Sequence, residues 1–187
     1  MDGHDILKLA SGVLAIGLYV PMILEIIRTR GAGQSFASWG LWAVLDIILT
    51  ITLWQQHGNY LLSLGYALGG IALALVVLQQ GRWTWGKFET IIALIVLASL
   101  AVLKFSGPRY ATVAFTVAVC IAGIPGFVDM LRNPQPSAGK IWAGFTVANV
   151  LAFFGGTAMT VEERLVPAAF IGLCGLMAVA CWWPVKK

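Results

Sequence analysis

Hydrophobic residues dominate the chain in long runs that short polar links interrupt. Each run has roughly 18 to 24 residues, long enough to cross a hydrocarbon core of about 30 Å as an α-helix. The expected spans cover residues 5–29, 37–55, 59–80, 88–105, 109–131, 140–160 and 164–183. None of the runs alternates hydrophobic and polar residues as a membrane β-strand does. We therefore predict an all-α protein with seven transmembrane helices.

Composition agrees with this assignment, since 59% of the residues are hydrophobic and 11% are charged, with a mean hydropathy of +0.87. The first span carries acidic residues and a long apolar run, so we expect it to be retained rather than cleaved as a signal. The cysteines, which are Cys120, Cys174 and Cys181, all lie inside apolar runs. Their positions indicate packing and no disulfide or metal framework.

The net charge of +4 comes from basic residues that gather in the links between spans. Counted in alternate links, lysine and arginine number eight on one side of the membrane and four on the other. By the positive-inside rule, the N-terminus is expected outside and the C-terminus inside, in a bacterial inner membrane. The clustering of basic residues in the links therefore indicates how the chain is oriented in the membrane and not that it binds nucleic acid.

Part of the chain occurs twice. Three pairs are 104 residues apart, namely Pro21 and Pro125, Glu25 and Asp129, and Arg28 and Arg132. After a one-residue deletion, a separation of 103 pairs Trp39 with Trp142, Asp46 with Asn149, and Gly69 with Gly172. These pairs indicate an internal duplication.

The duplication divides the chain into a three-helix repeat at residues 1–80, a linker helix within residues 81–108 and a second repeat at residues 109–187. The fourth span contains no glycine, proline or strongly polar face, which is typical of a lipid-facing linker. Two three-helix units that followed each other directly would be inverted in the membrane, because each has an odd number of spans. One linker span gives both units the same orientation, so the repeats are expected to be parallel and related by an axis along the membrane normal.

A proline within a helix removes a backbone hydrogen bond and bends the helix, so Pro21 and Pro125 should each bend a span. At equivalent positions they predict a paired hinge near the inner surface. The alternative is that membrane helices tolerate proline without a functional role.

Asp46 and Asn149 occupy matching positions near the middle of the membrane. An ionised carboxylate is costly there, so Asp46 should face a protein-lined or water-filled interior and serve as a substrate or proton site. A neutral aspartic acid that hydrogen-bonds between helices is the structural alternative. Tyr66 on the third span, with Trp42 and Phe145, completes the candidate binding residues.

Two acid–arginine pairs lie near the inner surface, Glu25 with Arg28 and Asp129 with Arg132. The i, i+3 spacing places each pair on one helical face. They form either an inner gate or ordinary solvated helix ends, because exposed ion pairs contribute little stability.

The sequence contains no catalytic carboxylate pair, metal-ligand spacing, nucleophile elbow or phosphate loop, so we expect neither an enzyme nor a cofactor or metal. The expected partners are a small solute and the bilayer, with protons and a second copy of the chain as further candidates.

The predicted arrangement is three helices, a linker helix and three more. In each three-helix unit the first helix contains a proline and is followed by a polar link, a serine and an aromatic residue. This pattern resembles that of the PQ-loop repeat proteins. This family includes the SWEET sugar transporters and their half-size bacterial relatives. The resemblance covers nearly the whole chain and rests on Pro21 and Pro125, each followed by a non-glutamine residue, Met22 or Gly126.

The resemblance implies two parallel three-helix bundles around a central site reached alternately from each side. It favours transport of a small polar solute, such as a sugar. With Asp46 in the second span, the chain also resembles the proton-coupled members of the family. This resemblance implies an amino acid or a vitamin-like solute as the alternative substrate. A receptor or scaffold that does not transport is the third hypothesis, and short links between spans argue against it.

Overall fold

The computed structural model describes residues 2–28, 30 and 35–183. Residues 1, 29 and 187, which bound some of the expected segments, lie outside this part of the chain. The described residues form seven long helices: α1 Gly3–Arg28, α2 Phe36–Gln55, α3 Leu61–Gln79, α4 Lys87–Ser106, α5 Pro108–Arg132, α6 Pro136–Gly155 and α7 Val166–Trp182. A π-helical turn, η1 Val161–Leu165, leads directly into α7.

All seven helices, with η1 counted as part of the last, are long and apolar enough to cross a membrane. The prediction of an all-α, multi-pass membrane protein is therefore confirmed. Side chains such as Val13, Leu24 and Leu97 are more than half exposed, as expected for positions that contact lipid.

Local sequence explains where several helices begin. Ser35 caps α2 by accepting a hydrogen bond from the Ser38 N–H at 3.4 Å. Proline occupies the first helical position of α5 and α6, where its fixed φ suits a helix and its missing N–H leaves no donor unsatisfied. The expected bounds of the sixth span, residues 140–160, were wrong, because Pro136 starts α6 earlier and Gly155 ends it earlier.

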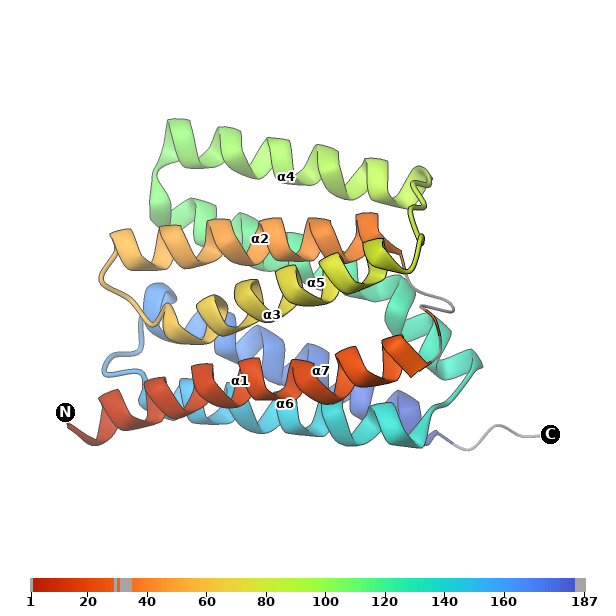
Figure 1. Ribbon diagram of the computed structural model, residues 1–187. Helices are drawn as coiled ribbons and strands as arrows, with labels where there is room; N and C mark the ends of the chain where they lie inside the picture. Colours follow the sequence, from red (N-terminus) through yellow and green to blue (C-terminus); the bar gives the residue numbers. More distant parts are fainter. Residues whose placement is uncertain (1, 29, 31–34, 184–187) are drawn as a thin grey trace.

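The helices lie side by side, and α1 begins at the face of the bundle opposite to the one where α7 ends (Figure 1). We call the face where α1 begins the N-terminal face and the face where α7 ends the C-terminal face. Helix α3 packs against both α1 and α2, and α7 packs against both α5 and α6. Between these groups α1 packs along α6 and α2 along α5, while α4 contacts α5 and α2 at one side (Figure 1).

Small residues allow α1 and α3 to approach closely. A Cβ atom added to Gly65 would lie 2.6 Å from the carbonyl oxygen of Gly12, and one added to Gly69 would overlap the ring of Tyr19. Gly65 and Gly69, four residues apart, therefore allow α1 and α3 to pack closely, as small residues at this spacing do in membrane helices.

Candidate functional site

A cavity of about 880 Å³ occupies the C-terminal half of the bundle. Its rim includes Asn133, Gln135 and Ser137, which are exposed and lie between α5 and α6 or at the start of α6. This volume lies within the range of about 300 to 1,000 Å³ that small-molecule sites occupy. The cavity is therefore large enough for a small solute and is reached from the C-terminal face.

Both prolines that recur 104 positions apart line this cavity. Pro21 lines it from α1 and Pro125 lines it from α5, and both helices continue through their proline. Because each proline frees a backbone carbonyl one turn earlier, the helix is weakest where it borders the cavity.

Tryptophan forms much of the cavity wall. Trp39 and Trp42 come from α2, with ring centroids 6.0 Å apart, and Trp142 comes from α6. All three residues line the cavity.

Helix α4 also contributes to the wall, through Phe88, Glu89 and Ile92. The Ser38 hydroxyl of α2 donates a 2.7 Å hydrogen bond to Oε1 of Glu89. The sequence interpretation of α4 as a lipid-facing linker is thus incomplete. Leu94 and Leu97 are exposed as expected, but one end of the helix closes the side of the cavity.

A layer of buried polar and aromatic residues lies one to two helical turns from the cavity, towards the N-terminal face. Trp42 and Asp46 are separated by four residues, so they share a face of α2. On α6, Trp142, Phe145 and Asn149 follow the same spacing rule. Asp46 and Asn149 therefore lie on the same helix faces as the cavity-lining Trp42 and Trp142.

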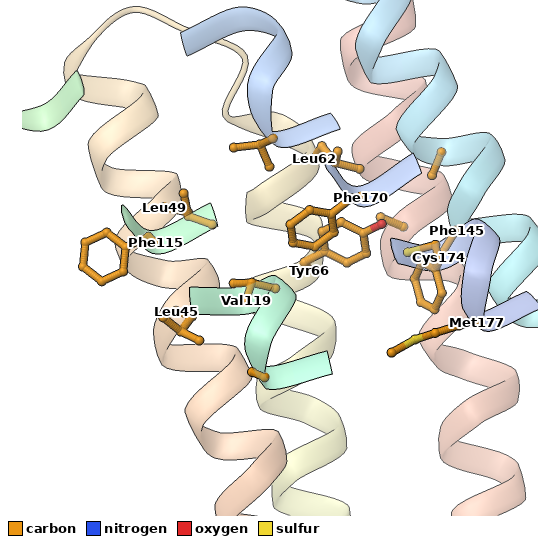
Figure 2. Close-up of a cluster of buried hydrophobic side chains, with 14 of the residues drawn as sticks. Leu45, Leu49, Leu62, Tyr66, Phe115, Val119, Phe145, Phe170, Cys174 and Met177 are labelled. Atoms are coloured by element: carbon orange, nitrogen blue, oxygen red, sulfur yellow. The ribbon is translucent and has the colours of Figure 1, made fainter. Parts of the chain in front are cut away.

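Asn149 is fully buried and ties three helices together. Its Nδ2 donates to the Tyr66 hydroxyl of α3 at 2.5 Å and to the Phe145 carbonyl at 2.7 Å, and it lies 3.9 Å from Sγ of Cys174 on α7. Figure 2 shows Tyr66 beside Phe170, with its hydroxyl oxygen directed towards Phe145 and Cys174. The structure thus brings together Tyr66, Phe145 and Asn149, three of the five binding residues expected from sequence.

Asp46 is also buried, with 2% of its surface exposed. Near it lie Tyr19, Tyr66 and Cys174, which belong to α1, α3 and α7. Among the described residues, Oδ1 of Asp46 and Oδ1 of Asn149 have no hydrogen-bond partner. We call Tyr19, Asp46, Tyr66, Asn149 and Cys174 the polar layer.

Phe145 separates the polar layer from the cavity. Its ring lies 5.7 Å from that of Trp142 on the cavity side, 5.3 Å from Tyr19 and 5.4 Å from Tyr66, all measured between centroids. Phe145 is 2% exposed, whereas Trp142 borders the cavity. An aromatic layer therefore covers the polar residues in this conformation.

The two expected acid–arginine pairs differ. Arg28 donates to Oε1 of Glu25 at 2.8 Å, so the first pair forms. Asp129 instead accepts a 3.0 Å hydrogen bond from Nδ2 of Asn133, and no ion pair joins it to Arg132 within the described part of the chain. Glu25 and Asp129 line the cavity, while Arg28 and Arg132 lie on the exposed surface near its mouth.

The N-terminal face has a set of contacts that sequence reasoning missed. Lys8 of α1 forms a salt bridge with Glu163 of η1, with Nζ 3.1 Å from Oε2, and their side chains are only 17% and 9% exposed. Near it, Nδ2 of Asn59 donates to the Ala152 carbonyl at 2.8 Å. Because these contacts join residues 155 and 93 positions apart, no local pattern could reveal them.

Further contacts join separate segments at the N-terminal face. Nε2 of Gln56, which follows α2, donates to Oγ1 of Thr112 on α5 at 2.8 Å. The Asn59 N–H donates to the Glu162 carbonyl at 3.0 Å, and the adjacent Gly58 leaves no room for a Cβ atom beside Glu162. Residues from both halves of the chain therefore meet at the N-terminal face.

In the described residues, no group of three or more histidine, cysteine, aspartate or glutamate side chains is arranged to hold a metal ion. The binding chemistry that these residues offer is that of a buried carboxyl group, an amide, hydroxyl groups and aromatic rings. Comparison with protein families, curated proteins and solved structures finds no match to this chain.

Proposed function

We propose that this protein is a membrane transporter that moves a small polar solute by alternating access. The observation that carries the proposal is the contrast between the two faces. A cavity of about 880 Å³ opens from the C-terminal face towards the polar layer, and buried polar contacts close the N-terminal face. This arrangement is expected of one end state in an alternating-access cycle, in which a central site is open to one side at a time.

The helix contacts support two parallel three-helix repeats joined by α4. Helix α3 lies against α1 and α2 as α7 lies against α5 and α6, and the contact of α1 with α6 has its counterpart in that of α5 with α2. In each repeat the first helix runs towards the C-terminal face and the second returns (Figure 1). A two-fold axis along the membrane normal would relate such repeats, and the residue pairs 103 or 104 positions apart fit that axis.

In this proposal Pro21 and Pro125 act as paired hinges. Both border the cavity, so bending at these prolines would narrow it while the contacts at the N-terminal face separate. By the positive-inside count, the C-terminal face is cytoplasmic, and the conformation described is then inward-open.

Reconstitution tests the proposal. Purified protein in liposomes should accelerate the uptake of at least one member of a panel of sugars, amino acids, amines and nucleosides relative to empty liposomes. A stoichiometric protein partner in a pull-down, with no solute flux across the panel, would favour the receptor or scaffold hypothesis instead.

Proton coupling is a second candidate property, because Asp46 is a buried carboxyl group with an unpartnered oxygen. The titratable groups near it are Tyr19, Tyr66 and Cys174. If Asp46 carries the coupled proton, Asp46→Asn should make flux much less dependent on the pH gradient. Unchanged dependence would assign Asp46 a structural role.

A further inference from the structure

Acidic residues predominate among the charged side chains that line the cavity. Glu25, Glu89 and Asp129 line it, together with Lys140. Arg28, which pairs with Glu25, and Arg132 lie outside the cavity wall, on the exposed surface near the mouth. On the cavity wall acidic side chains therefore outnumber basic ones by three to one, which favours a positively charged solute over an anion inside the cavity.

The aromatic wall favours the same charge. Trp42 and Trp142 line the cavity from the two helices that carry the polar layer's Asp46 and Asn149. The face of an indole ring attracts cations, more strongly than the rings of tyrosine or phenylalanine, and the attraction increases where water is excluded.

The polar layer offers unsatisfied acceptors. Oδ1 of Asp46 and Oδ1 of Asn149 have no hydrogen-bond partner among the described residues, and the two side chains are 2% and 0% exposed. No basic side chain forms an ion pair with Asp46 within residues 2–28, 30 and 35–183. A buried carboxylate is favourable only when a positive charge or several donors accompany it, so a ligand with N–H groups and a positive charge fits these atoms.

Building on the proposed transport function, we infer that the solute is a small organic ammonium ion. The cation passes the faces of Trp42 and Trp142, and its N–H groups donate to Asp46 and Asn149. The distance to be covered is short, because Asp46 lies one helical turn, or about 5 Å, beyond Trp42 on the same face of α2. Phe145 must shift to admit the ammonium group, since its ring covers Asn149 from the cavity side.

A pair of probes that differ in charge tests this inference. In 4-aminobutan-1-ol an ammonium group replaces one hydroxyl of butane-1,4-diol, so the two probes have nearly the same size. Titration calorimetry on the purified, detergent-solubilised protein at pH 7 should show the amine binding at least about tenfold more tightly than the diol. Equal affinities, or tighter binding of the diol, would overturn the inference.

Substitutions locate the effect. Asp46→Asn preserves the shape of the side chain and should reduce the preference for the amine to about twofold or less. Asp5→Asn makes the same chemical change at an exposed position on the N-terminal face and should retain the full preference. If both variants retain it, Asp46 is not the cation-binding group and the inference fails.

Trp42→Leu provides a second variant for the case in which Asp46→Asn does not yield folded protein. It keeps an apolar side chain on the cavity wall but removes the π-face, so the amine should bind several-fold more weakly while the diol is unaffected. An equal loss for both probes would assign Trp42 a steric role and contradict the inference.

Flux measurements separate this inference from the proposed function. If liposomes transport a neutral sugar and not the amine, the substrate class is wrong and transport stands. If no solute of the panel crosses but the amine binds selectively through Asp46, transport fails and the ammonium site stands.

Discussion

The two faces of the bundle hold charged residues in different ways. At the N-terminal face, Lys8 and Glu163 form a salt bridge that is mostly buried and joins α1 to η1. At the C-terminal face, Glu25 and Arg28 pair within one helix, and their side chains are 46% and 77% exposed. The first pair links the two halves of the chain, whereas the second leaves the cavity mouth open. Of these two ion pairs, the one that joins different helices holds its face of the bundle closed.

The largest expected difference between the faces is in chemical accessibility. Ala138 and Ala152 both belong to α6, but Ala138 lines the cavity and Ala152 is fully buried near the N-terminal face. In a chain without its native cysteines, Ala138→Cys should react with a charged thiol reagent about a hundredfold faster than Ala152→Cys, since the latter requires local opening. Similar rates would mean that the cavity face is not the preferred open side.

Removing one partner of the buried pair should have the next largest effect. Glu163→Gln leaves Lys8 without its counter-charge in a site of low exposure, so unfolding in detergent should become easier by about 2–3 kcal/mol. The same change should speed the labelling of Ala152→Cys by loosening the N-terminal face. The exchanged pair, Lys8→Glu with Glu163→Lys, is the control and should recover most of the loss; no recovery would indicate that the position matters and not the pairing.

A smaller effect distinguishes two glycines that are 103 positions apart in the sequence. Gly69→Ala places a methyl group against the ring of Tyr19, so it should destabilise the fold by about 1–3 kcal/mol and weaken solute binding below the cavity. Gly172→Ala is the matched control, because a Cβ atom there meets nothing within 4 Å. Thermal unfolding of the two variants tests this difference, and equal effects would contradict the packing of Tyr19 described above.

The smallest effect is expected at the exposed pair. Glu25→Gln removes an ion pair that water already screens, so the free energy of unfolding should change by less than about 0.5 kcal/mol. A loss comparable to that of Glu163→Gln would show that Glu25 has a structural role and would remove the contrast between the two faces.

Hydropathy alone predicted the number of spans, because crossing a bilayer requires a long apolar run that few other structures contain. It predicted the helix ends less well. The apolar run at residues 140–160 continues past Gly155, where α6 stops, and the polar start of α6 at Pro136 has no hydropathy signal. The proline at the first helical position of α6 explains why this helix begins outside the apolar run.

The duplication predicted more of the candidate site than composition did. Matching the repeats drew attention to Asn149, which is not unusual by itself, and the structure places it fully buried beside Tyr66. The Lys8–Glu163 pair and the hydrogen bond from Asn133 to Asp129 could not be predicted in this way. Such contacts depend on how helices pack and on which of several nearby donors an acid selects.

The aromatic ring of Phe145 has an electrical consequence. If the protein lies in the membrane as proposed, with the cavity open to one aqueous side, most of the transmembrane voltage would fall across the remaining thickness, from Phe145 to the closed N-terminal face. One elementary charge moved across 100 mV changes the free energy by about 2.3 kcal/mol. A cation that passes Phe145 would therefore cross most of the membrane field beyond this single ring, and its transport would respond to membrane potential as well as to concentration.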